Sequence, residues 1–90
     1  MSVDDDIRKV MYATHRPMLV SYAVSFVGSR DDAEEVVQEV FTKLTPDSLS
    51  NVETPIAYLR TMVRNLAINR RRRRRYELEQ ATEHAPEWMQ

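Results

Sequence analysis

The 90-residue sequence contains no cysteine and only one glycine, Gly28. Without cysteine the chain can form no disulfide framework, no thiolate metal site and no cysteine nucleophile. No apolar run approaches the ~18–20 residues that a membrane span needs, and the N-terminal residues are acidic where a signal peptide would be basic and then apolar. We therefore predict a cytoplasmic protein with no segment inserted in a membrane.

The sequence also lacks the usual constellations of catalytic residues. Its two histidines, His15 and His84, are isolated from each other and from any nucleophile. It contains no Ser/His/Asp set, no paired carboxylate pocket, no glycine-rich phosphate loop and no HExxH spacing. These absences predict a protein that is not an enzyme and that uses no cofactor, no metal and no small-molecule substrate.

The composition, 42% hydrophobic and 30% charged residues, is typical of one soluble globular domain. The net charge of −1 hides a separation of charge along the chain. Residues 54–76 carry eight arginines and no acidic residue, whereas the rest carries five basic and fourteen acidic residues, a net charge of −9. A chain polarised in this way is expected to meet one polyanionic and one basic partner.

Helical periodicity accounts for most of the chain, and no alternation is long enough for a sheet. We predict an all-α fold, a compact bundle of three main helices over about residues 4–27, 31–44 and 55–75. Asp31 and Glu34 form a variant capping box for the second helix, and Thr54 caps the third with Pro55 at its first position. The first helix is predicted to be kinked or broken near Pro17 and to stop at Gly28. Each helix has an apolar stripe that is predicted to face the core. In the first helix it consists of Ile7, Val10, Met11, Leu19, Tyr22, Ala23 and Phe26. In the second it consists of Ala33, Val36, Val37, Val40, Phe41 and Leu44, and in the third of Ile56, Leu59, Met62, Val63, Leu66 and Ala67.

The most conspicuous feature is a run of six arginines at 70–75. Such a run is often only a solvated helix end, and it is also typical of RNA-binding and nuclear-localisation patches. Here Arg60 and Arg64 extend the basic character along a helix that also presents an aromatic residue and two amides. Arginine holds phosphates, amides read base edges and an aromatic ring stacks on an unpaired base. This combination favours nucleic acid, with two or three of the six arginines on phosphates.

The second helix carries acidic and polar residues opposite its apolar stripe, and solubility alone would explain them. Because they are distant from the arginines in sequence, we do not expect them to assist DNA binding. If they bind a partner, that partner is a basic protein surface.

The segments "DDAEEVVQEVF" and "TPIAYLRTMVRNLAINRRRR" resemble the second domain of extracytoplasmic-function (ECF) sigma factors of bacterial RNA polymerase. The resemblance covers about residues 5–75, and the loop "DSLSNVETPIAYL" looks more like the iron-starvation subgroup, which controls ferric-siderophore uptake. It implies a transcription initiation factor that binds core RNA polymerase and recognises and melts the promoter −10 element. An anti-sigma factor is implied as a further partner.

The resemblance also implies roles for particular residues. Glu35, Gln38 and Glu39 would dock on the clamp helices of the polymerase β′ subunit. Residues of the loop and of the third helix would read and hold the non-template strand of the −10 element, with the arginines on phosphates. These DNA-binding residues are Ser48, Leu49, Ser50, Asn51, Tyr58, Arg60, Thr61, Met62, Arg64, Asn65, Asn69, Arg70 and Arg71.

The sequence departs from the family pattern at three points. Tyr58 stands where tryptophan is common, which keeps a stacking face, and Asn69 stands where aspartate is common, which removes a charge. The helix-turn-helix domain that reads the −35 element, domain 4, is absent, so we expect residues 1–76 to form domain 2 and residues 77–90 to begin an interdomain linker of a longer protein. Two other functions remain open at this point, an arginine-rich RNA-binding module and a structural helical adaptor.

Overall fold

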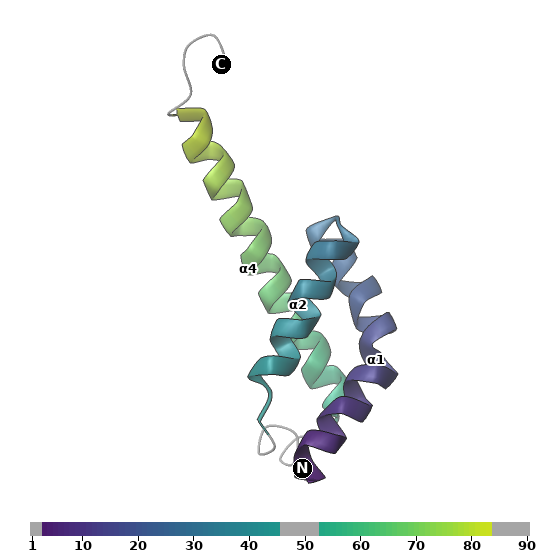
Figure 1. Cartoon of the computed structure of the whole chain (residues 1–90). Coiled ribbons are helices and arrows are strands. Elements are labelled where there is room, and N and C mark those ends of the chain that lie inside the picture. Colours follow the sequence, from purple (N-terminus) through teal and green to yellow (C-terminus); the bar gives the residue numbers. More distant parts are fainter. Residues whose placement is uncertain (1–2, 46–52, 84–90) are drawn as a thin grey trace.

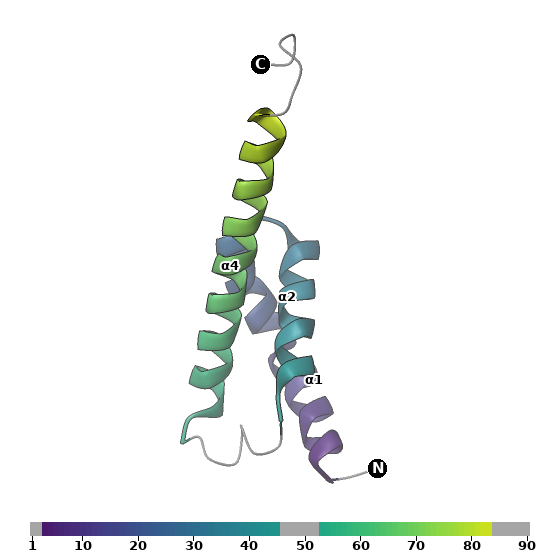
Figure 2. The ribbon, with the colours of Figure 1, turned by 90° about the vertical axis from the view of Figure 1, so that its left-hand side faces the viewer.

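The computed structural model describes residues 3–45 and 53–83, and within these ranges the side chains of residues 6–45 and 53–81. These residues form three helices, α1 (Val3–Val27), α2 (Arg30–Lys43) and α4 (Pro55–Glu83), and no strand is present among them. Each helix packs against the other two, and the principal extents are 58 × 25 × 21 Å (Figures 1 and 2). The prediction of an all-α bundle of three main helices is confirmed.

Helix α1 is not broken at Pro17. The helix continues through the proline as one ribbon from Val3 to Val27 (Figure 1). Proline removes one intrahelical hydrogen bond because it has no amide hydrogen, but the residues that follow it compensate by packing. Leu19, Val20 and Ala23, all buried, lie in the two turns after Pro17 and hold this half of α1 against the other helices.

The turn between α1 and α2 depends on Gly28 and Ser29. Gly28 has a φ of 80°, a left-handed conformation that favours glycine, and its amide donates to the carbonyl of Val24 over 2.8 Å. The Ser29 side chain then accepts a hydrogen bond from the Asp32 amide over 3.2 Å and caps α2. The prediction that Asp31 begins the capping box was therefore wrong by two residues, because serine is an equally good cap and comes first.

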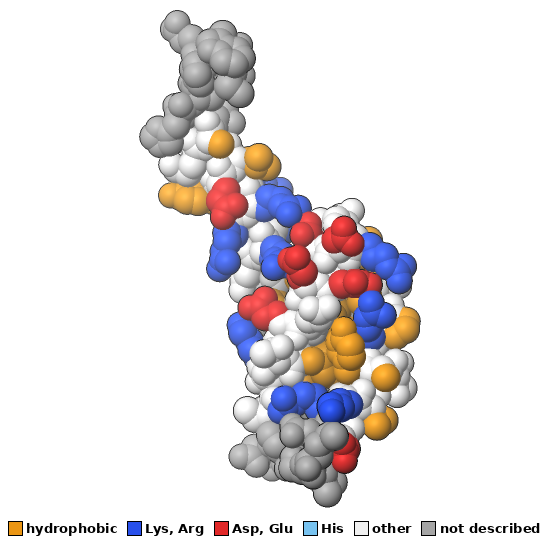
Figure 3. Space-filling model, viewed as in Figure 1, with side chains coloured by type: hydrophobic (Ala, Val, Ile, Leu, Met, Phe, Trp, Pro, Cys, Tyr) orange, Lys and Arg blue, Asp and Glu red, His pale blue; other side chains and the backbone are white. Residues whose placement is uncertain are grey.

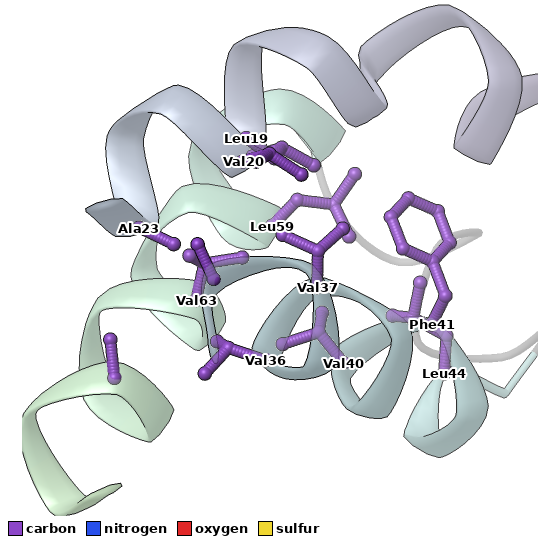
Figure 4. Packing of buried hydrophobic residues seen from close by; sticks show 12 residues of the cluster. Leu19, Val20, Ala23, Val36, Val37, Val40, Phe41, Leu44, Leu59 and Val63 are labelled. Atoms are coloured by element: carbon purple, nitrogen blue, oxygen red, sulfur yellow. The ribbon is translucent and has the colours of Figure 1, made fainter. Parts of the chain in front are cut away.

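One hydrophobic core joins the three helices (Figure 4). The stripe predicted for α2 is confirmed, since all six of its residues are buried. The stripes predicted for the other helices were too long: Ile7 is 47% exposed, Val10 63% and Ile56 40%. Ile7 and Val10 lie toward the N-terminal end of α1 and Ile56 lies in the first turn of α4, at the periphery of the bundle. The core consists of Leu19, Val20, Ala23, Ala33, Val36, Val37, Val40, Phe41, Leu44, Leu59, Val63 and Ala67.

Helix α4 begins at Pro55 as predicted, and the Tyr58 amide donates to the Thr54 carbonyl over 3.1 Å. It does not end near Arg75 but continues to Glu83, so its 29 residues span about 43 Å. The predicted end near residue 75 was therefore eight residues too early, because residues 77–81 are mostly good helix formers. As a result the part of α4 after Arg74 projects beyond the bundle (Figure 1).

Candidate nucleic-acid interface and the acidic face of α2

The outer face of α4 presents most of the side chains that the sequence predicts to contact DNA. Arg60, Thr61, Arg64, Asn65 and Asn69 are all exposed. The Thr61 hydroxyl donates to the Ala57 carbonyl over 3.0 Å, so it is already engaged within the helix.

The remaining predicted residues differ in their placement. Tyr58 and Met62 are only partly exposed because they pack against the core. Ser48, Leu49, Ser50 and Asn51 lie outside the described residues.

Two amides and two arginines line one shallow hollow on α4. The hollow, with a volume of about 420 Å³, is lined by Arg64, Asn65, Ile68, Asn69 and Arg72. These residues share a face because side chains three and four positions apart are neighbours on a helix. Arg72 was missed as a specific contact, although its spacing of three residues from Asn69 and eight from Arg64 could have revealed it. Along the helix, the two asparagines fall between the two arginines.

Arg60 is held by an aromatic ring of another helix. Its Cζ atom lies 4.8 Å from the centroid of the Tyr22 ring of α1. Tyr22 in turn makes an edge contact with Phe26, with 5.2 Å between ring centroids. A guanidinium at this distance from a ring is attracted to its face. Arg60 is therefore oriented by α1 while it remains exposed.

The arginine run divides into two sets, and one set contacts α2. Arg70 Nη1 lies 3.0 Å from Glu35 Oε2 and donates to the Asp32 carbonyl oxygen over 3.2 Å. One turn later, Arg74 Nη1 lies 2.7 Å from Asp32 Oδ2. Figure 3 shows acidic side chains gathered over α2 with basic side chains beside them over α4. We call these four residues, Asp32, Glu35, Arg70 and Arg74, the α2–α4 clasp.

The clasp corrects one inference from the sequence. The acidic residues of α2 were expected to lie far from the arginines, but packing of the two helices brings residues separated by 35 to 42 positions into contact. Arg70, predicted as a phosphate contact, is held by α2. The other four arginines, Arg71, Arg72, Arg73 and Arg75, are all exposed.

The three residues predicted to bind polymerase lie on one face of α2. Glu35 and Gln38 are exposed, and Glu39 is half-buried beside Lys43, with 3.3 Å between Oε1 and Nζ. Glu34 has a different role: its Oε1 atom lies 2.5 Å from Arg16 Nη2 and 3.7 Å from Arg30 Nε. Glu34 thus ties α2 to α1, and the outer acidic face consists of Glu35, Gln38 and Glu39.

Among the described residues, no group of three or more His, Cys, Asp or Glu side chains could hold a metal ion. None of the described helices is both long enough and apolar enough to cross a membrane. Among the described residues, the two candidate binding surfaces are the basic face of α4 and the acidic face of α2.

These features define an all-α domain in which a basic, amide-bearing helix lies beside an acidic one. The family model for sigma-70 region 2 matches residues 11–76, which include most of α1, all of α2 and α4 as far as Tyr76. The chain therefore belongs to the sigma-70 region 2 family, the part of sigma factors involved in binding core RNA polymerase and in melting promoters. These are transcription factors that act without catalysing a reaction themselves. Comparison with curated proteins gave no match, and neither did comparison with solved structures.

Proposed function

We propose that this chain is the second domain of an ECF sigma factor and that it recognises and opens the promoter −10 element. The observation that carries this proposal is the exposed face of α4, where Asn65 and Asn69 lie between Arg64 and Arg72. Amides can pair with base edges, and the flanking arginines can hold the phosphates of the same strand. A face of about two and a half helical turns suits several successive nucleotides of an unpaired strand.

The proposal also assigns a partner to the acidic face of α2. Glu35, Gln38 and Glu39 would dock on the basic clamp helices of the polymerase β′ subunit in the bacterial cytoplasm. Ser48, Leu49, Ser50 and Asn51 would complete the DNA-reading surface. The boundary between domain and linker near residue 76, the iron-starvation subgroup and an anti-sigma factor that covers these surfaces belong to the same proposal and rest on the sequence resemblance.

The DNA half is tested with a labelled non-template strand of the −10 element and a scrambled strand of the same length. Asn65→Ala should weaken binding of the promoter strand by about 1–3 kcal/mol and affect the scrambled strand much less, because a lost base contact is sequence-specific. Gln80→Ala removes an amide from the projecting part of α4 and serves as the matched control. Equal losses on both strands would mean that Asn65 does not read bases.

The polymerase half is tested by pull-down of core RNA polymerase. Glu35→Arg combined with Glu39→Arg should abolish the pull-down, since the acidic face would then repel a basic partner. The helical circular dichroism should stay unchanged. A double variant with the same change of charge, Glu77→Arg with Glu79→Arg, lies on the projecting part of α4 and should still capture the polymerase. Undiminished capture by the α2 variant would refute this half of the proposal.

An RNA-binding module is distinguished by competition. Structured RNA should displace the promoter strand less effectively than unlabelled promoter strand does. A preference for the RNA would favour the arginine-rich module over the sigma factor.

A further inference from the structure

The α2–α4 clasp joins the two surfaces to which the proposed function assigns different partners. Glu35 belongs to the acidic face of α2, and Arg70 belongs to the basic helix α4. The Nη1 atom of Arg70 is shared between the Glu35 carboxylate at 3.0 Å and the Asp32 carbonyl at 3.2 Å. Any partner that engages either residue of this ion pair therefore changes the surroundings of the other.

Exposure differs within the clasp and indicates which contact a partner can reach. The Glu35 side chain is 62% exposed, whereas the Asp32 side chain is 17% exposed. A basic protein surface that docks on α2 can reach the Glu35 carboxylate easily and the Asp32 carboxylate hardly at all. The Asp32–Arg74 pair can thus hold α4 against α2 while the Glu35–Arg70 pair is exchanged.

We propose that Glu35 holds Arg70 away from nucleic acid in the free domain and releases it when a basic partner binds α2. The proposal rests on the proposed function only for the identity of the two partners, core polymerase and promoter DNA. Once the Glu35 carboxylate pairs with the polymerase, the Arg70 guanidinium is available for a backbone phosphate. By linkage, DNA bound at Arg70 strengthens polymerase binding at Glu35 by the same factor.

The size of the effect follows from the exposure of the pair. Ion pairs at a protein surface change an equilibrium constant by up to about 5-fold, and salt screens them. We therefore expect the clasp to weaken binding of single-stranded DNA by about 2- to 5-fold at low salt, and by less at high salt.

The test measures the affinity of the 90-residue chain for a fluorescent −10 non-template strand at low salt. Glu35→Gln should tighten binding by about 2- to 5-fold because it frees Arg70. Asp31→Asn is the matched control: it also removes one negative charge from α2, but Asp31 is not part of the clasp and should give a smaller gain. In an Arg70→Gln background, Glu35→Gln should have no more effect than Asp31→Asn. Equal gains from the two variants, or a gain that persists without Arg70, would overturn the proposal.

A second measurement separates the coupling from the function on which it rests. With saturating core polymerase bound, Glu35 should no longer hold Arg70. The wild-type chain and Glu35→Gln should then bind the strand with equal affinity. An advantage of Glu35→Gln that persists in the bound complex would overturn the coupling and leave the proposed function intact. Failure of the wild-type chain to bind core polymerase at all would instead refute the proposed function.

Discussion

Replacement of Leu59 by alanine tests how the reading face of α4 is held in place. Leu59 is fully buried on α4, between the exposed Arg60 and the partly buried Tyr58, and it packs with residues of α1 and α2 (Figure 4). A buried Leu→Ala change removes apolar contact and leaves a cavity, and typically lowers the free energy of unfolding by about 2–5 kcal/mol. For a domain of this size the total is about 5–15 kcal/mol. The change should therefore remove a large share of the stability.

Urea denaturation followed by circular dichroism measures the loss as a lower midpoint with an unchanged slope. Ile56→Ala is the matched control, because Ile56 lies one turn earlier on the same helix and is already 40% exposed. It should lose less than half as much free energy, since less apolar surface returns to water and alanine is the better helix former. Equal losses from the two variants would refute the inference that α4 is docked through Leu59.

Three further predictions concern the turn and the arginines. Gly28→Ala should lower the free energy of unfolding by about 1–2 kcal/mol through backbone strain alone, because the φ is positive and an added Cβ would meet no atom within 4 Å beyond the adjacent residues. Thermal melting should show a smaller loss for Gly28→Asn. Ser29→Ala should lower the free energy of unfolding by about 1 kcal/mol, whereas Ser29→Asp should keep the cap and lose less. An equal loss from both variants would contradict the capping role of Ser29. Arg72→Gln should weaken binding of promoter and scrambled strands alike and reduce the salt dependence by about one phosphate contact, whereas a sequence-specific loss would mean that Arg72 reads a base.

Local patterns in the sequence predict the interior of the fold well. All six residues of the α2 stripe are buried, and so are Leu59, Val63 and Ala67 of α4. These residues recur at three and four positions, and a helix that follows this spacing can bury them only on one face. The start of α4 at Pro55 follows from equally local chemistry.

The features that local patterns did not predict depend on contacts between helices. The division of the arginine run arises because α2 lies beside Arg70 and Arg74 and not beside Arg71 or Arg72. Nothing within the run distinguishes one arginine from the next, so the distinction appears only when the two helices pack. The exposure of Ile7 and Val10 has a similar origin, since their helical spacing is correct but they lie at the end of α1, where the predicted core does not extend.

The length of α4 has a consequence for how its residues meet a nucleic-acid strand. From Ile56 to Glu83 the helix contains no glycine and no proline, so Asn65, Asn69 and the arginines belong to one stiff rod without a hinge. The helix geometry therefore fixes both their spacing along the axis and their angles around it. Insertion of one residue after Asn69 would turn every following arginine by about 100° around the axis. Arg73 would then take the place of Arg74 beside Asp32, and the inserted residue would take the place of Arg70 beside Glu35.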